Sequence, residues 1–169
     1  MKPKTARALG ALAIALAALW LHWPPEDAEF NLDDHGFVAA NQSLRSMGAA
    51  TQALLRSFPP AENDRGLYRP VTNFSHALEW PFFGDAARGY HAVDAVLYAV
   101  VVLLVYAFVA GFRVGGAAAL AATALFAFHP VHTEAVDAVA GRSELLALAF
   151  VLGALLAWRR ALFAPGAHL

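Results

Sequence analysis

The chain has 169 residues, of which 59% are hydrophobic and 15% are charged, and its formal net charge is -1. Because the apolar residues are gathered into long runs, this composition excludes an ordinary soluble domain and is typical of a membrane protein. The near-neutral charge excludes a nucleic-acid partner. The absence of cysteine excludes disulfides, thiolate metal sites and cysteine nucleophiles.

Residues 1–23 are expected to form the first transmembrane helix. Lys2, Lys4 and Arg7 precede an apolar run from Ala8 to Trp23. This order also fits a cleaved secretory signal. The run ends, however, in tryptophans and prolines rather than in a small-residue cleavage site, and tryptophans gather at membrane interfaces. We therefore interpret it as an uncleaved first span.

Residues 24–90 are expected to form a long polar loop that carries an acidic pair, Asp33–Asp34. From Phe37 to Leu55 an amphipathic pattern predicts one or two short helices along the membrane surface. The stretch from Phe58 to Gly66 is a turn-rich break, and Val71 to Trp80 is predicted to form another helix.

Residues 91–160 are expected to contain three more transmembrane helices, followed by a cytoplasmic tail at 161–169. Their apolar runs are His91–Phe112, Val114–Phe128 and Leu145–Trp158. The last two runs are shorter than the roughly 20 residues that a crossing needs. Part of the HPVHTEAVDAV segment between them is therefore expected to help span the bilayer, buried in protein or lining a wet cavity.

The basic residues beside the spans predict the orientation. With four spans, they all fall on one side, which is then cytoplasmic together with the amino terminus: Lys2, Lys4, Arg7, Arg113, Arg159 and Arg160. The long loop and the HPVHTE loop then face outward. The preference for arginine over lysine hints at a bacterial genome, and so at a bacterial inner membrane.

These patterns predict an all-α fold. We expect a polytopic membrane protein with about four transmembrane helices. Its long extracytoplasmic first loop should contain short amphipathic helices.

The acidic pair is the first candidate for chemistry. Asp33 and Asp34 could supply a general base or a metal ligand. The alternative is that an aspartate here caps the start of an amphipathic helix. The residues alone leave both interpretations open.

The second candidate is the H-x-x-H-x-E pattern of His129, His132 and Glu134. Pro130 makes a regular helix unlikely to include His129, which favours a hydrogen-bonding or phosphate-contacting role over a metal site. Capping of the following helix by Thr133 is the structural alternative.

Two arginines beside turn residues form the third group. Arg69 precedes Pro70 and Arg142 follows Gly141, so each could clamp a lipid-linked phosphate through its guanidinium fork. The alternative for Arg142 is a surface arginine paired with Glu144 or a headgroup. Four further groups are spaced so that some can share a cavity: His76, Glu79, His91 and Asp94.

Five segments, in order, resemble the amino-terminal part of the transmembrane and tetratricopeptide-repeat family of protein O-mannosyltransferases. They are DDHGFVAAN, LYRPVTNFSHALEWPFFG, GYHAVDAVLYAV, FHPVHTEAV and AGRSELLA, and the resemblance extends from Phe30 to Trp158. These enzymes are lipid-phosphate-sugar-dependent glycosyltransferases of the GT-C type. The tetratricopeptide pattern itself is absent from this chain.

The resemblance implies inverting transfer of a sugar, mannose in the characterised members, from a polyprenyl phosphate to protein Ser or Thr hydroxyls. It assigns the base to Asp33 or Asp34. Arg69 and Arg142 become candidates to stabilise the departing phosphate, and the remaining candidates would shape the pocket: His129, His132 and Glu134. No metal ligand is assigned, although a divalent cation stays open as a cofactor. Asp94 stands where the family usually has Asn.

The implied partners are the lipid-linked sugar, an acceptor protein and the bilayer. Because relatives have many more spans, the chain is expected to be a fragment or a truncated form that a second chain or a carboxyl-terminal part completes. The alternative functions are a non-catalytic membrane protein that binds a lipid phosphate or a protein partner, and a small metal transporter that uses His129, His132, Glu134 and Asp94.

Overall fold

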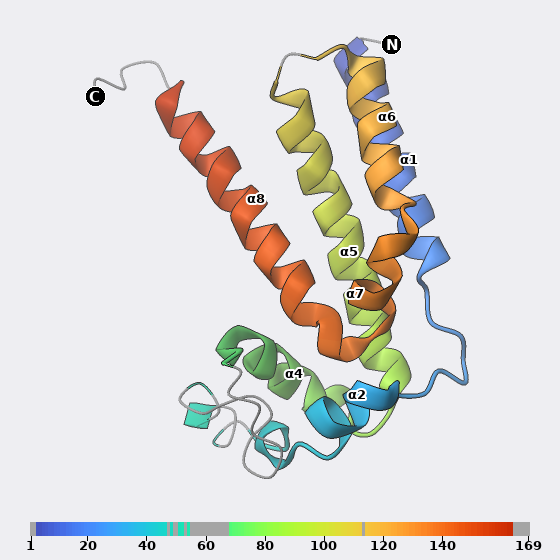
Figure 1. The fold of residues 1–169 in the computed structure, drawn as a ribbon, viewed down its shortest axis with the longest axis vertical. Helices are drawn as coiled ribbons and strands as arrows, with labels where there is room; N and C mark the ends of the chain where they lie inside the picture. Colours follow the sequence, from blue (N-terminus) through green and yellow to red (C-terminus); the bar gives the residue numbers. More distant parts are fainter. Residues whose placement is uncertain are drawn as a thin grey trace.

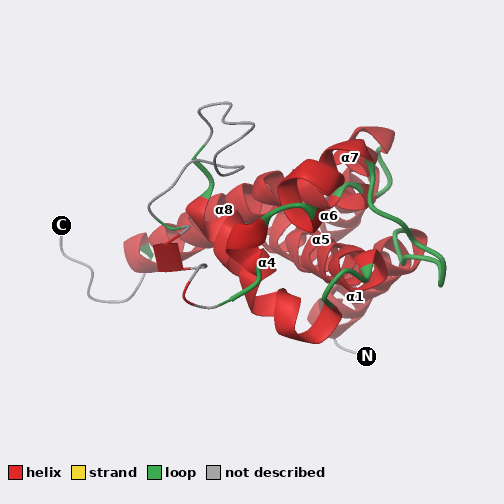
Figure 2. Cartoon of the chain, turned by 90° about the horizontal axis from the view of Figure 1, so that it is seen from below, coloured by secondary structure: helices red, strands yellow, loops and turns green. Residues whose placement is uncertain are grey.

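The structure is a computed structural model that describes residues 3–46, 48, 51–52, 54, 68–112 and 114–163. Four helices stand side by side and the shorter elements gather at one end (Figure 1). The described residues contain helices and loops but no strand (Figure 2), which confirms the predicted all-α class. The four helices are α1 (Pro3–Leu21), α5 (Ala87–Ala110), α6 (Gly116–Ala127) and α8 (Arg142–Leu162).

Three of these helices are long and apolar enough to cross a membrane, and they correspond to Lys4–Leu21, Ala87–Ala110 and Val139–Leu162. Large apolar side chains such as Trp20 and Phe150 remain exposed on them. An apolar surface of this extent is stable against lipid or further protein rather than against water. The chain is therefore an integral membrane protein.

The α6 helix has only 12 residues. At 1.5 Å per residue it spans about 18 Å, less than the roughly 30 Å of a hydrocarbon core. The chain continues in the same direction through η3 (Pro130–His132) and α7 (Thr133–Asp137), beside α5 (Figure 1). The Tyr98 hydroxyl donates to the carbonyl of Ala127, at 3.0 Å, and so satisfies the open end of α6. The contribution of HPVHTEAVDAV to the crossing and the count of four spans both stay predictions.

The α8 helix begins at Arg142, three residues before the predicted apolar run, and has 21 residues. The prediction that the fourth run is too short to cross is therefore wrong. The helix starts before the apolar run because carboxylates inside the protein neutralise the charge of Arg142.

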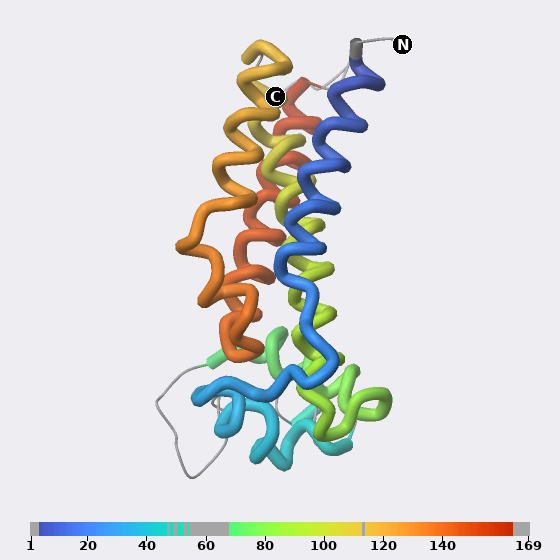
Figure 3. Tube along the Cα trace, turned by 90° about the vertical axis from the view of Figure 1, so that its right-hand side faces the viewer, coloured from blue at the N-terminus to red at the C-terminus, as the bar shows by residue number. Residues whose placement is uncertain are grey.

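The short elements form a cap at one end of the four helices (Figure 3). Its core is an apolar cluster in which Phe37, Val38 and Leu44 pack with Tyr90 and Val139. The cap comprises α2 (Leu32–Asp34), η1 (His35–Ala39), η2 (Gln42–Leu44), α4 (Pro70–Phe83) and η4 (Val139–Gly141).

The α4 helix confirms the helix predicted at Val71–Trp80, and η1 with η2 gives short helices at the start of the amphipathic stretch. Most of that stretch after residue 46 lies outside the described residues. So do the predicted break at Phe58–Gly66, the basic residue Arg113 and residues 164–169 of the expected tail.

Gly84 turns the chain from α4 into α5. Its φ of 52° lies in the region that favours glycine. The Tyr90 hydroxyl donates to the Gly84 carbonyl at 3.0 Å, which ties the first turn of α5 back to this corner.

Candidate functional site

The two aspartates of the acidic pair have different environments. Both lie in α2, whose N-cap residue is Asn31 and whose capping box Asp34 completes. Asp34 also occupies the N-cap position of η1, as the capping alternative predicts, although its side chain makes no cap hydrogen bond there. Asp34 is fully buried, whereas Asp33 is exposed. Asp34 Oδ2 accepts from the Asn31 backbone N–H at 3.1 Å, and its Oδ1 accepts from the Ala140 N–H at 2.7 Å. Asp34 thus holds the loop against η4 through two hydrogen bonds, whereas Asp33 lies on the surface of the described residues.

Arg69 and Asp34 both form hydrogen bonds with the backbone of Ala140. Its Nη1 donates to the Ala140 carbonyl at 3.4 Å, while Asp34 holds the Ala140 N–H. The turn η4 is therefore held from both sides, and Asp34 and Arg69 meet there although 35 residues separate them in sequence. This turn leads directly into α8.

An apolar groove of about 230 Å³ extends from Arg69 along the first turns of α8. Leu146, Ala147 and Phe150 form its α8 side, and Pro70 and Val71 belong to the start of α4. Because α8 is a candidate membrane span, the groove begins at the cap end of that span. A cation above an apolar groove suits an amphiphile with an anionic head.

Arg142 lies in a buried ionic cluster rather than on the surface. Its side chain is 1% exposed, its Nε donates to Asp94 at 2.5 Å, and its Nη1 donates to Glu79 at 2.5 Å. Its Nη2 donates to the Tyr90 carbonyl at 3.1 Å. The alternative interpretation, a surface arginine paired with Glu144, is wrong. The guanidinium joins α4, α5 and α8.

His76 completes this cluster from α4. It is fully buried, its Nδ1 lies 4.0 Å from Glu79, and neither ring nitrogen has a hydrogen-bond partner within the described residues. Burial, together with the charge of Arg142, lowers the pKa of His76 from 6.5 to about 4. The imidazole is therefore neutral at physiological pH.

The HPVHTE residues lie at the junction of α6 and α7. His129 has extended backbone, as Pro130 predicts, and its Nδ1 accepts from the Val131 N–H at 3.2 Å. The His132 ring lies against Phe126, with 4.4 Å between ring centroids. Glu134 is exposed. In the described part of the chain, no group of three or more His, Asp or Glu side chains is arranged to hold a metal ion.

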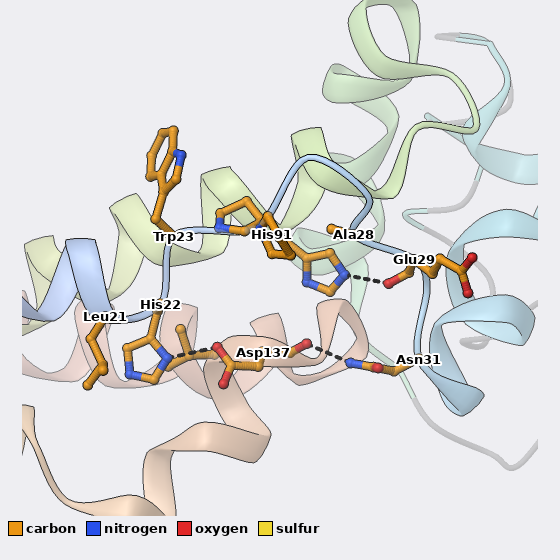
Figure 4. Close-up of a pocket in the computed structure, with 11 residues that line it drawn as sticks. Leu21, His22, Trp23, Ala28, Glu29, Asn31, His91 and Asp137 are labelled. Carbon is orange, nitrogen blue, oxygen red and sulfur yellow. Dashed lines mark hydrogen bonds and ion pairs between the residues drawn. The ribbon is translucent and has the colours of Figure 1, made fainter.

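A second pocket, of about 350 Å³, lies between the end of α1 and α7 (Figure 4). His22 Nδ1 is 2.7 Å from Asp137 Oδ1 at its wall. Asn31 Nδ2 donates to the Asp137 carbonyl at 2.7 Å, and His91 Nε2 contacts the Glu29 carbonyl at 3.0 Å. The four residues that were grouped by spacing are thus divided: His91 faces this pocket, whereas His76, Glu79 and Asp94 surround Arg142.

Sequence reasoning missed His22 as a site residue because it was read only as the end of a span. The one available signal was a polar side chain between the two interfacial tryptophans, Trp20 and Trp23. Its partner, Asp137, is 115 residues away in sequence.

Comparison with known sequences confirms the resemblance. The chain is 32% identical over 141 residues to protein O-mannosyl-transferase F38B6.6 of Caenorhabditis elegans, a match that covers 76% of this chain and 20% of that protein. It is 31% identical over 155 residues to protein O-mannosyl-transferase Tmtc1 of Drosophila melanogaster, covering 89% of this chain and 18% of the relative. It is 29% identical over 143 residues to protein O-mannosyl-transferase TMTC3 of Homo sapiens, covering 82% of this chain and 16% of that protein.

The chain therefore spans about a fifth of the length of the curated relatives that it matches. No family model and no solved structure matches it.

Proposed function

We propose, from the sequence kinship of this chain with the amino-terminal region of the protein O-mannosyl-transferases, that it forms the donor and base region of a membrane glycosyltransferase. The reaction transfers a sugar, mannose, from a polyprenyl-phosphate donor to Ser or Thr hydroxyls of an acceptor protein. Transfer takes place on the extracytoplasmic face. The observation that carries the proposal is the convergence on Ala140 of Arg69 and of Asp34, the chain neighbour of Asp33.

In this proposal Asp33 is the general base. Its exposed carboxylate takes the proton of the acceptor hydroxyl, whose oxygen attacks the anomeric carbon of the sugar while the bond to the lipid phosphate breaks. Asp34 is a positioning residue, because its two oxygens are engaged by the backbone N–H groups of Asn31 and Ala140. This division follows from burial and hydrogen bonding.

Arg69 stabilises the leaving phosphate, and the adjacent groove holds the first part of the polyprenyl chain. A phosphate leaving group needs charge stabilisation in the transition state, which a guanidinium supplies. The groove beside Arg69 has apolar walls from Leu146 and Phe150, which suit isoprenoid units. Arg142 is assigned a different role from the one first considered: it holds the helices together, because Asp94 and Glu79 already engage it. His129, His132 and Glu134 keep the proposed role of shaping the pocket.

The orientation belongs to the same proposal. The cap with Asp33 and Arg69 lies at one end of the helices, and Arg7 and Arg160 belong to the opposite end (Figure 1). Four crossings then place the amino terminus in the cytoplasm and the cap outside. The matched relatives are animal proteins, so they add no support to the expected bacterial inner membrane, which rests on the arginine-rich composition alone.

The test is a transfer assay in membranes that contain the natural full-length product of the gene. The donor is polyprenyl-phosphate mannose labelled in the sugar, and the acceptor is a Ser/Thr peptide. Asp33→Asn should lower transfer about 100-fold or more, the usual range for loss of a general base. Asp27→Asn, an exposed aspartate of the same loop, is the matched control and should leave transfer unchanged.

Equal transfer by Asp33→Asn and the unsubstituted protein would contradict the assignment of the base. A protein that binds the donor, keeps it bound in the Asp33→Asn variant and transfers nothing would support the second candidate, a non-catalytic membrane protein that binds a lipid phosphate. The Arg69 groove favours that second function as much as it favours the first.

A further inference from the structure

The pocket between α1 and α7 shares no lining residue with the Arg69 groove. It is formed by the end of α1, the segment that follows α1, His91 of α5, and Asp137 at the end of α7 (Figure 4). Its volume of about 350 Å³ is within the usual range for small-molecule sites. Apart from Asn31, the N-cap residue of α2, none of its polar side chains has a role in the proposed transfer.

Three polar side chains of the pocket are fixed by hydrogen bonds. His22 is held by Asp137, Asn31 by the Asp137 carbonyl, and His91 by the Glu29 carbonyl. A group that is already oriented loses little freedom when a ligand binds. The pocket is therefore preorganised.

The hydrogen bonds also determine what the pocket offers to a ligand. A carbonyl oxygen only accepts, so His91 Nε2 must be the donor to Glu29, which leaves His91 Nδ1 as an acceptor. Asp137 Oδ1 accepts from the Nδ1–H of His22, and in this tautomer of the neutral ring Nε2 is an acceptor. The second oxygen of Asp137 makes no hydrogen bond within the described residues, whereas the side-chain oxygen of Asn31 belongs to the capping box of α2.

The pocket thus presents mostly acceptors. It matches a ligand rich in O–H donors and disfavours a phosphate, which is itself an acceptor and is negatively charged like Asp137. The remaining wall includes Trp23, half exposed at 49%, with Pro24 and Pro25. An aromatic ring beside polar groups suits the C–H face of a sugar ring.

We propose that this pocket binds the neutral sugar ring, with Asp137 and the two histidines accepting hydrogen bonds from its hydroxyl groups. The choice of mannose as that sugar rests on the proposed function, whereas the preference for a hydroxyl-rich neutral ligand rests on the pocket alone. Asp137 is a binding residue in this account and takes no proton from the acceptor.

The experiment is a titration of the detergent-purified protein with methyl α-D-mannoside, followed by tryptophan fluorescence. Trp23 serves as the reporter, and Trp23→Phe should remove the signal. We expect a saturable change with the mannoside and none with inorganic phosphate. Asp137→Asn, which replaces an acceptor oxygen by a donor, should weaken binding at least 10-fold. Glu26→Gln, at an exposed acid of the same segment outside the pocket lining, should leave binding unchanged.

Circular dichroism verifies that the variants fold, and ligand-observed NMR of the mannoside measures binding without the Trp23 signal. Absence of saturable mannoside binding, equal binding by Asp137→Asn, or preferential binding of phosphate would each overturn the proposal. Preferential binding of a Ser/Thr peptide would also overturn it, because the pocket would then serve the acceptor. Mannoside binding without any transfer in the membrane assay would instead refute the proposed function and leave the sugar pocket standing.

Discussion

Replacement of Arg142 by methionine should strongly destabilise the protein. The substitution leaves two carboxylates, Asp94 at 0% and Glu79 at 14% side-chain exposure, without their cation. Removal of one partner from a buried ionic network typically costs about 3–5 kcal/mol, because the remaining charge stays desolvated. For a protein of this size each kcal/mol lowers Tm by roughly 2–4 °C, so a decrease of roughly 6–20 °C is expected.

The assay is thermal unfolding in detergent micelles, followed by far-UV circular dichroism. Arg160→Met is the control, because Arg160 is an exposed arginine in the last turn of the same helix. Adding Asp94→Asn and Glu79→Gln to Arg142→Met should recover at least half of the lost stability, since no uncompensated charge then remains. A Tm for Arg142→Met within 2 °C of the Arg160→Met value would refute the structural role, and would return Arg142 to the phosphate-clamp role considered first.

Three further predictions concern the cap. Burial lowers the pKa of His76 from 6.5 to about 4 in the folded protein. Between these two pH values the unfolded chain therefore binds a proton at His76 and the folded protein does not. The free energy of unfolding should therefore fall by about 3 kcal/mol between pH 6.5 and pH 4, and denaturant titrations of His76→Phe should show a smaller decrease. Gly84→Ala should cost about 1–3 kcal/mol in the same titrations from backbone strain alone, because a Cβ there would contact nothing within 4 Å; an unchanged midpoint would contradict the φ of 52°. Asp34→Ala should cost about 1–3 kcal/mol, since the buried Ala140 N–H and the partly buried Asn31 N–H lose their acceptor, whereas Asp33→Ala should stay within about 0.5 kcal/mol. Equal losses of unfolding free energy in the two alanine variants would contradict the assignment of Asp34 as a structural residue and Asp33 as an exposed base.

The membrane helices could largely be predicted from the sequence, because a long apolar run has few alternatives to a buried or lipid-facing helix. The boundary that failed was the start of α8. Apolar periodicity cannot reveal that Arg142 is neutralised by Asp94 and Glu79, which are 48 and 63 residues away along the chain. Charged residues therefore marked the apparent start of the run at Leu145, although the helix begins three residues earlier, at Arg142.

The candidate site was predictable in composition but not in arrangement. The acidic pair, Arg69 and the HPVHTE residues stood out because ionisable groups near membrane spans are costly. Which aspartate is available could not be predicted, since it depends on the Ala140 N–H, 106 residues from Asp34. The pocket around His22 was hidden for the same reason.

The central claim is that the cap, with Asp33 and Arg69, faces away from the cytoplasm. The most direct measurement is cysteine labelling with a membrane-impermeant maleimide in sealed vesicles whose cytoplasmic face points inward, which is clean because the chain has no cysteine. Gly36→Cys, exposed in the cap, should label without permeabilisation, and Arg160→Cys only after it. Labelling of Arg160→Cys alone in sealed vesicles, or of both positions, would contradict the account.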